Sequence, residues 1–333
     1  MKKKGFTLVE LLVVIAIIAM LLAILMPALG KVRQLAQRIM CATNLGGIGK
    51  AMLTYATDDE YESFPIAGGG SAKWDYGTAT VEGKCSWAWD KPYEVPPGKT
   101  PPPTSTLSAN LYLLVKYGGV SPEQFICPGG GEKKFDMSVY KLKSYAGVSA
   151  LTITDVWDFG LPNALATDLQ AGKSRGRGHN SYSYQLPLSA KLMGAPDNQC
   201  FAVNATVNPS MPVMADRNPF WDKVNPERAP YSWDVDKGGP KSETIPQGNS
   251  QAHQKDGQNV AYADQHVKFE KTANCGIDRD NIYATWGKDV LILPTDESLR
   301  QGCTDPGDPK GISFTTMKPP QNADDSWLIN DYN

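Results

Sequence analysis

The sequence is poor in the residues from which catalytic and metal sites are commonly built. It has three histidines in 333 residues, too few and too scattered to predict a metal-ligand constellation. It has no Cys-x-x-Cys pair, which argues against a zinc ribbon and a thioredoxin-like site, and no Gly-x-Ser-x-Gly motif to support catalysis. The formal net charge of −2 gives no indication of nucleic-acid binding. We therefore expect no enzyme, no resident metal and no nucleic-acid partner.

Glycine and proline, by contrast, are abundant, with 31 and 25 residues, and eight tryptophans are present. Such a composition favours a β-rich, loop-rich domain outside the cytoplasm over a helical bundle. No internal repeat is evident along the chain.

The first thirty residues combine a basic start with a long apolar run. Lysines occupy positions 2–4, Gly5 follows, and the apolar run extends from Leu11 to Met26. Residues 8–29 are about long enough to cross a bilayer as a helix, at roughly 20 residues. Glu10 is the exception, because an acidic residue in such a segment costs on the order of 2.5–3.5 kcal/mol near the bilayer centre. A plain single-span anchor with Glu10 near the headgroups is the simpler alternative.

The order of this segment resembles the leader of type IV pilins and type II secretion pseudopilins. The resemblance implies that a prepilin peptidase cuts between Gly5 and Phe6 and that Phe6 is then methylated. Glu10 becomes the fifth residue of the mature chain, where pilins carry a glutamate. Its implied partner is the free amino group of Phe6 in a neighbouring subunit.

The helical pattern continues beyond the apolar run. Pro27 lies inside it and should kink or loosen the helix, and pilins also carry a proline near this position. An approximate helical stripe follows at residues 32, 35, 39, 48, 52 and 53. Gly46, Gly47 and Gly49 weaken the helix by roughly 1 kcal/mol each relative to alanine, yet one helix to about Tyr55 remains the prediction.

The rest of the chain reads as short elements among long loops. Residues 66–105 form a proline-, glycine- and tryptophan-rich insert, which contacts a partner or a glycan, or is pinned to its own domain by its tryptophans. A short helix is predicted at 107–117, and short strands at 181–184 and 211–216.

A second motif lies between His253 and Glu270. Asp256 and Gly257 signal a turn, and two alternating runs, one starting at Asn259, predict a β-hairpin. The motif resembles the His, nine residues, Asp-Gly signature of the large pilin-like proteins of Planctomycetes, Verrucomicrobia and Lentisphaerae. Here ten residues separate His253 from Asp264, and a glutamine replaces the glycine, so we expect the hairpin to use another turn type.

Two interpretations of this motif stay open. His253, Asp256 and Asp264 could hold a calcium ion, because hard cations take oxygen ligands from loops. Alternatively, His253 and Asp264 fix the hairpin by side-chain hydrogen bonds, which is the interpretation we favour.

The six cysteines are even in number and should lie outside the cytoplasm, where disulfides persist. Free buried thiols are the alternative, and fifteen connectivities are possible for six cysteines. The preferred pairs are Cys41 with Cys127, Cys275 with Cys303, and Cys85 with Cys200.

Together these observations predict an α+β fold: a long, pilin-like N-terminal helix packed on an antiparallel β-sheet with large loop insertions. The predicted divisions are a leader (1–5), a helix (6–57) and a globular domain (58–333). The helix has a transmembrane half (6–29) and an amphipathic half (30–57), and the domain carries the 66–105 insert and a C-terminal extension (271–333).

The resemblance implies a structural subunit of a type IV pilus or type II secretion pseudopilus. Its expected partners are prepilin peptidase, the inner membrane, further copies of itself and other pilins or pseudopilins. The precursor would span the inner membrane once with its leader in the cytoplasm, and the assembled filament would be periplasmic or on the cell surface. The alternative is a minor pilin or a surface-displayed binding or adhesion protein that uses its enlarged globular domain.

Overall fold

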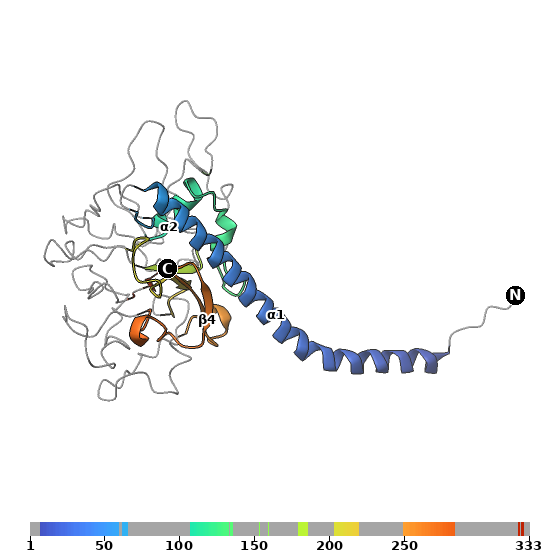
Figure 1. Ribbon diagram of the computed structural model, residues 1–333. Coiled ribbons are helices and arrows are strands. Elements are labelled where there is room, and N and C mark those ends of the chain that lie inside the picture. Colours follow the sequence, from blue (N-terminus) through green and yellow to red (C-terminus); the bar gives the residue numbers. More distant parts are fainter. Residues whose placement is uncertain are drawn as a thin grey trace, which may run out of the picture.

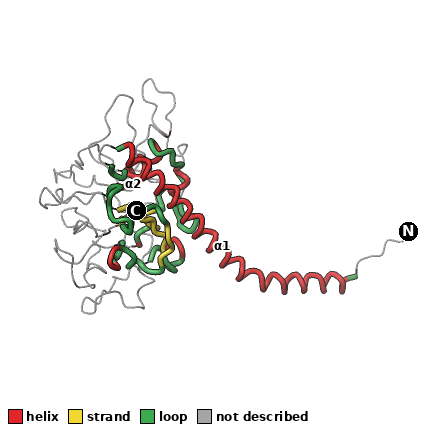
Figure 2. Tube along the Cα trace, viewed as in Figure 1, coloured by secondary structure: helices red, strands yellow, loops and turns green. Residues whose placement is uncertain are grey.

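The computed structural model of the chain describes residues 7–59, 62–65, 107–132, 134–135, 153, 159, 179–185, 203–219, 249–283, 326 and 328–329. The described elements form a long helix, one end of which lies against an antiparallel sheet while the other end projects away from it (Figure 1). Figure 2 shows the helices in red, the strands in yellow and the loops that connect them in green. The predicted α+β class is confirmed. The predicted 66–105 insert lies outside the described residues.

The projecting element is α1, Leu8–Asp58, which begins after a complete capping box. The Thr7 backbone N–H donates to the Glu10 carboxylate at 2.8 Å, and the Glu10 N–H donates to the Thr7 hydroxyl at 3.3 Å. These bonds satisfy backbone donors that have no partner inside the helix. Pro27 lies inside α1, and Figure 1 shows that the helix bends along its course, as expected when a ring replaces a backbone donor.

The second half of α1 buries one stripe of side chains against the domain. Its members lie three or four residues apart, the spacing of one helix face; they are Cys41, Leu45, Ile48, Met52 and Ala56.

The stripe predicted from the sequence is right only in part. Ile48 and Met52 are buried, whereas the predicted members at positions 32, 35, 39 and 53 are exposed. In the first half of α1, apolar residues occur on all sides of the helix. Extending that pattern past Pro27 therefore does not show which side of the second half contacts the sheet.

Five strands form one antiparallel sheet in the order β4-β3-β2-β1-β5. They are β1 Tyr182–Gln185, β2 Pro212–Asp216, β3 Gln258–Tyr262, β4 Val267–Glu270 and β5 Leu328–Ile329. The strands predicted at 181–184 and 211–216 correspond to β1 and β2 within one residue. α1 contacts β2, β3 and β4, so the helix covers the middle and one edge of the sheet.

The two central strands contribute to a core on each face of the sheet. On the α1 side, Met214 and Ala261 pack in a cluster with Leu45. On the opposite face, Ala215 and Val260 pack in a second cluster that contains Tyr283. Neighbouring residues of a strand point to opposite faces, which explains why β2 and β3 are buried along their whole length.

A short helical layer closes the α1 side of the core. It consists of α2, Leu107–Lys116, which agrees with the predicted helix, and of η1, Pro122–Phe125. The segment after η1 is held on both sides: Asn44 of α1 donates to the Ile126 carbonyl at 3.1 Å, and the Ser181 N–H donates to the Phe125 carbonyl at 2.8 Å. These bonds fix the position of the next residue, Cys127.

The predicted hairpin is confirmed as β3 and β4, with Asn259 opposite Phe269. Its turn is not a two-residue primed turn. The Gln265 N–H donates to the Tyr262 carbonyl at 2.9 Å, and the Tyr262 N–H donates to the His266 carbonyl at 3.0 Å. Three residues therefore form the loop, and Gln265 takes the left-handed position with φ 75°, where glycine is usual.

Candidate functional site

The chain presents two candidate sites, of which the first is the N-terminal half of α1. The predicted processing residues Gly5 and Phe6 lie outside the described residues. Glu10 is exposed and is held by Thr7, whose hydroxyl donates to the carboxylate at 2.7 Å. Glu10 therefore lies in the first turn of the helix, where a negative charge is favourable.

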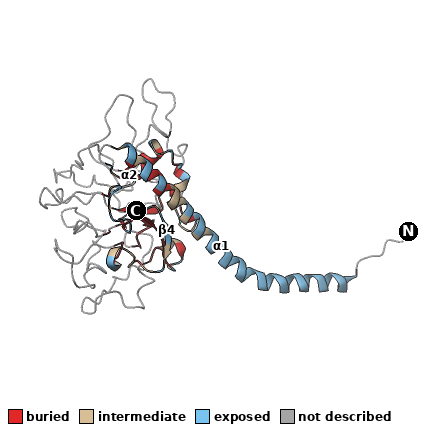
Figure 3. Ribbon diagram, viewed as in Figure 1, coloured by how far each residue is buried: buried red, intermediate tan, exposed pale blue. Residues whose placement is uncertain are grey.

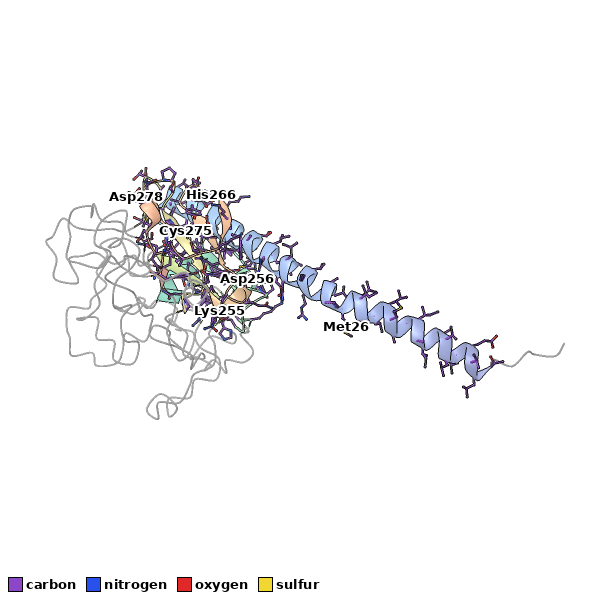
Figure 4. The ribbon with its side chains drawn as sticks, turned by 90° about the horizontal axis from the view of Figure 1, so that it is seen from below. Met26, Lys255, Asp256, His266, Cys275 and Asp278 are labelled. Atoms are coloured by element: carbon purple, nitrogen blue, oxygen red, sulfur yellow. The ribbon has the colours of Figure 1, made fainter. Side chains whose placement is uncertain are left out.

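The apolar half of α1 is not covered by any of the residues that the structure describes. Every residue from Leu8 to Leu29 is exposed (Figure 3), and Met26, labelled in Figure 4, lies well away from the sheet. By length and composition this part of α1 could cross a membrane. A surface of this kind requires lipid or other apolar helices around it, because so large an apolar area is unfavourable in water.

The second candidate site is a buried group of four side chains, named the buried cluster: Cys41, Cys127, Asp216 and His253. Each comes from a different part of the fold: Cys41 from α1, Cys127 from the segment after η1, Asp216 from the end of β2, and His253 from η5, Gln251–His253. All four are at most 4% exposed. One candidate ligand atom from each lies within 4.8 Å of the other three.

The contacts inside the buried cluster are short and converge on one point. The Cys41 thiol donates to Asp216 Oδ1 at 2.8 Å, His253 Nε2 lies 3.1 Å from Asp216 Oδ2, and Cys127 Sγ lies 3.7 Å from His253 Nε2. The carboxylate and Cys127 therefore meet the same nitrogen of the imidazole ring.

Burial and mutual contact shift the ionisation of these groups. Burial is the largest cause that raises the pKa of the Cys41 thiol. Hydrogen bonds and charge interactions with Cys127 and Asp216 raise it further. The hydrogen bond with Cys41 lowers the pKa of Cys127 to about 7 against the opposing effect of burial, and His253 adds to the lowering. Burial opposes the charged form of His253, but hydrogen bonds to Asp216 and Cys127 outweigh it and raise its pKa to about 10.

Asn259, a residue of the predicted motif, supports the buried cluster from β3. Its backbone N–H donates to Asp216 Oδ2 at 2.7 Å. Its side-chain Nδ2 lies 3.1 Å from His253 Nε2 and donates to the Arg38 carbonyl at 3.3 Å. Asn259 thus links the cluster to α1 and holds the carboxylate in place.

The geometry does not match a Cys-His-Asp catalytic triad. In a triad the acid binds one ring nitrogen and the nucleophile faces the other, so that the imidazole relays a proton. Here both Asp216 and Cys127 face Nε2. Cys127 is also only 1% exposed, which closes the thiol to a substrate. The arrangement is instead that of side chains gathered around a shared centre.

The predicted calcium ligands do not gather in this way. Asp256 pairs with Arg38 of α1, and Figure 4 shows Asp256 beside Lys255. Asp264 contacts His266 Nδ1 at 2.5 Å. Among the residues that the structure describes, the buried cluster is the one group of three or more His, Cys, Asp or Glu side chains close enough to share an ion.

His253 and Asp264 both make side-chain hydrogen bonds, but to different partners. Asp264 accepts from the His266 N–H at 3.1 Å and so caps the hairpin turn. His253 instead faces Asp216, a residue that the sequence analysis did not assign to a site.

Gly257 has φ 152° and lies against the Glu270 carbonyl.

Of the predicted cysteine pairs, the structure brings one together. Cys41 and Cys127 are neighbours in the buried cluster, but both are free thiols, so the predicted bond is not formed between them. Cys275 is also a free, half-buried thiol, and its predicted partner Cys303 lies outside the described residues, as do Cys85 and Cys200.

Comparison with known proteins bears on the first site. Residues 1–26 match the prokaryotic N-terminal methylation motif. The chain has a prepilin-type N-terminus. The match supports a type IV pilin-like protein and a membrane-anchored precursor, and it favours a structural role over an enzymatic one. No curated protein and no solved structure matches the chain.

Proposed function

We propose that this chain is a structural subunit of a type IV pilus or type II secretion pseudopilus. It is made as a membrane-anchored precursor, cleaved after Gly5, methylated on Phe6 and polymerised through α1. The observation that carries the proposal is the coincidence of the methylation motif at 1–26 with an apolar half-helix that none of the described residues covers.

The exposed half of α1 explains why such a subunit would polymerise. In the membrane its side chains from Leu8 to Leu29 are surrounded by lipid. In a filament the same surface packs against the equivalent helices of neighbouring subunits, which removes it from water. The sheet and its covering layer would then lie on the outside of the filament, joined to its core by the second half of α1.

Glu10 has a role in this assembly. In the single chain its carboxylate accepts two bonds from Thr7. Within a helical filament core, a carboxylate without a cationic partner is costly. The proposed partner is the amino group that cleavage creates on Phe6 of a neighbouring subunit. One such ion pair per subunit would fix the register of the helices along the filament.

The partners follow from this route. Prepilin peptidase removes residues 1–5, the inner membrane holds the precursor, and other pilins or pseudopilins join the filament. The globular domain faces the periplasm or the cell surface. The minor-pilin alternative shares all these steps and differs in where the subunit lies along the fibre.

Mass spectrometry of the N-terminal peptide tests the processing step. We expect a mature chain that begins with methylated Phe6, and a Gly5→Leu variant that keeps its leader. A mature chain that begins near Lys31 would contradict the proposal and indicate an ordinary signal peptide.

Immuno-electron microscopy of surface or periplasmic fibres tests the assembly step. Label along the whole fibre supports the proposed subunit, whereas label restricted to fibre tips supports the minor-pilin alternative. Absence of the chain from fibres, with correct processing, would contradict both. The Gly5→Leu variant is the matched control, because it should remain in the membrane fraction.

A further inference from the structure

We propose that the buried cluster of Cys41, Cys127, Asp216 and His253 is a binding site for one zinc-class divalent cation, which fastens α1 to the sheet. The site is distinct from the N-terminal half of α1 and goes beyond the proposed function.

The first argument is the chemistry of the donor atoms. Two sulfurs, one imidazole nitrogen and one carboxylate oxygen make a mixed set of soft and borderline ligands. Such sets favour Zn²⁺ over Ca²⁺ and Mg²⁺, which prefer oxygen alone. Four protein ligands complete a tetrahedron and leave no open position, which is the mark of a structural site.

The second argument is the spacing of those atoms. Tetrahedral zinc with bonds of about 2.0–2.3 Å places its ligand atoms roughly 3.3–3.8 Å from one another. Cys127 Sγ and His253 Nε2 are 3.7 Å apart, and His253 Nε2 and Asp216 Oδ2 are 3.1 Å apart. The closest pair, Cys41 Sγ and Asp216 Oδ1 at 2.8 Å, needs to open by about half an ångström. All four ligand atoms lie within 4.8 Å of one another, so binding an ion requires them to shift by about 1 Å at most.

The third argument is charge in a buried place. The Asp216 carboxylate is fully buried, and among the described residues its one ion-pair partner is His253. Buried charges in proteins are paired or coordinate metals. Bound Zn²⁺ would offset two of the three negative charges of the carboxylate and two thiolates, whereas one protonated imidazole offsets only one.

The fourth argument is the layer of bonds behind the ligands. The Gly129 N–H donates to Cys127 Sγ at 3.4 Å, and the Asn259 N–H donates to Asp216 Oδ2 at 2.7 Å. Groups that hold metal ligands in place commonly make such bonds.

A Cys41–Cys127 disulfide, predicted from the sequence, is the competing state. It would use both sulfurs and leave Asp216 and His253 with no shared centre. The metal explains why all four side chains converge, whereas the disulfide explains only two of them. The two states exclude each other, so one experiment separates them.

The decisive measurement is the metal content of the full-length chain, purified in detergent with a tag that contains no histidine. We expect about one zinc ion per chain when the metal is quantified by inductively coupled plasma mass spectrometry. Cys127→Ser and Asp216→Asn should each lower the content at least tenfold. Cys275→Ser and His266→Gln are matched controls, because both residues lie outside the cluster, and they should keep the metal.

Cobalt substitution gives a second readout that does not depend on the variants folding. The wild-type chain, stripped with a chelator under reducing conditions and loaded with Co²⁺ alone, should show the visible absorption of a tetrahedral site with thiolate ligands. Zn²⁺ should displace it at one equivalent, and the stripped chain should melt at a lower temperature than the zinc-loaded chain.

Three results would overturn the proposal. The first is a wild-type chain without metal in which peptide mapping finds a Cys41–Cys127 disulfide. The second is a reduced, folded wild-type chain that takes up neither Zn²⁺ nor Co²⁺ at equimolar concentration. The third is metal content that survives both Cys127→Ser and Asp216→Asn, which would place the ion elsewhere. None of these results bears on cleavage after Gly5 or on filament assembly.

Discussion

Gln265 places its side-chain oxygen in the space that the missing side chain of Gly49 leaves on α1. A β-carbon on Gly49 would lie 2.7 Å from Gln265 Oε1, and Nε2 of the same amide donates to the Ala263 carbonyl at 3.0 Å. At Gly46, by contrast, a β-carbon would lie an ordinary 3.7 Å from Val267 of β4. Gly49, although it weakens the isolated helix, thus allows α1 to approach the hairpin closely.

This contact predicts an energetic coupling between the two residues. Gly49→Ala should lower the free energy of unfolding by about 1 kcal/mol, because overpacking against Gln265 outweighs the gain in helix propensity. The cost lies at the lower end of the usual range since the end of a glutamine side chain can shift. Gly30→Ala is the matched control; nothing lies within 4 Å of that position, so the same change should be neutral or stabilising.

A double-mutant cycle in chemical denaturation checks the coupling. In a Gln265→Gly background, which keeps the left-handed turn position, Gly49→Ala should behave like Gly30→Ala. An equal cost of Gly49→Ala in both backgrounds would mean that Gln265 is not the obstacle.

Gly257 predicts a larger loss from a fixed backbone contact. It has φ 152°, and a β-carbon there would lie 2.3 Å from the Glu270 carbonyl oxygen. Gly257→Ala should therefore lower the free energy of unfolding by about 3 kcal/mol or more, since strain and a backbone collision add. Gly119 also has a positive φ, 66°, but nothing lies within 4 Å, so Gly119→Ala should cost only about 1 kcal/mol. Similar losses at both positions would contradict the role given to the Glu270 contact.

The sequence predicted local elements better than the contacts between them. The hairpin followed from the alternation in β3 and β4, and the long helix from its apolar run and the helical stripe that continues beyond it. The buried stripe of α1 followed only in part, because Leu35 and Ile39 repeat at helical spacing yet are exposed. The positive φ of Gln265 was not expected, since its cost of about 1–2 kcal/mol is offset by tertiary contacts that no local rule includes.

The buried cluster was missed for a related reason. Its members lie on four elements far apart in the chain, so no spacing pattern connects Cys41 with Asp216. His253 and the pair of Cys41 and Cys127 were singled out separately. The prediction that the helix packs on the sheet could have connected these residues, because such packing turns Cys41 toward β2 and β3.

The four cysteines outside the buried cluster carry a prediction of their own. Cys275 is a free thiol in the structure, and we expect export into an oxidising compartment to bond it to Cys303, and Cys85 to Cys200. A disulfide that closes a loop of tens of residues stabilises the folded protein by about 2–4 kcal/mol. Non-reducing peptide mapping of the periplasmic or surface form checks it, and Cys275→Ser should lower the melting temperature only under oxidising conditions. Quantitative alkylation of Cys275 in the native, unreduced protein would contradict the pairing.

The final prediction separates two roles of Glu10, capping the helix and setting register in a filament. Glu10→Val and Glu10→Gln should both insert into the membrane as well as the parent or better, because each removes a costly charge. Both should impair filament assembly, since neither offers a carboxylate to the Phe6 amino group of a neighbour. Thr7→Ala is the matched control. It removes the hydroxyl of the capping box, at a cost of about 1 kcal/mol in helix stability, but keeps the carboxylate, so its filaments should form. Fibre yield per cell, counted against equal amounts of processed subunit, is the measurement. If Glu10→Gln assembles like the parent, charge pairing does not set the register, and if Thr7→Ala fails as badly as Glu10→Val, the carboxylate acts through the helix end that it caps.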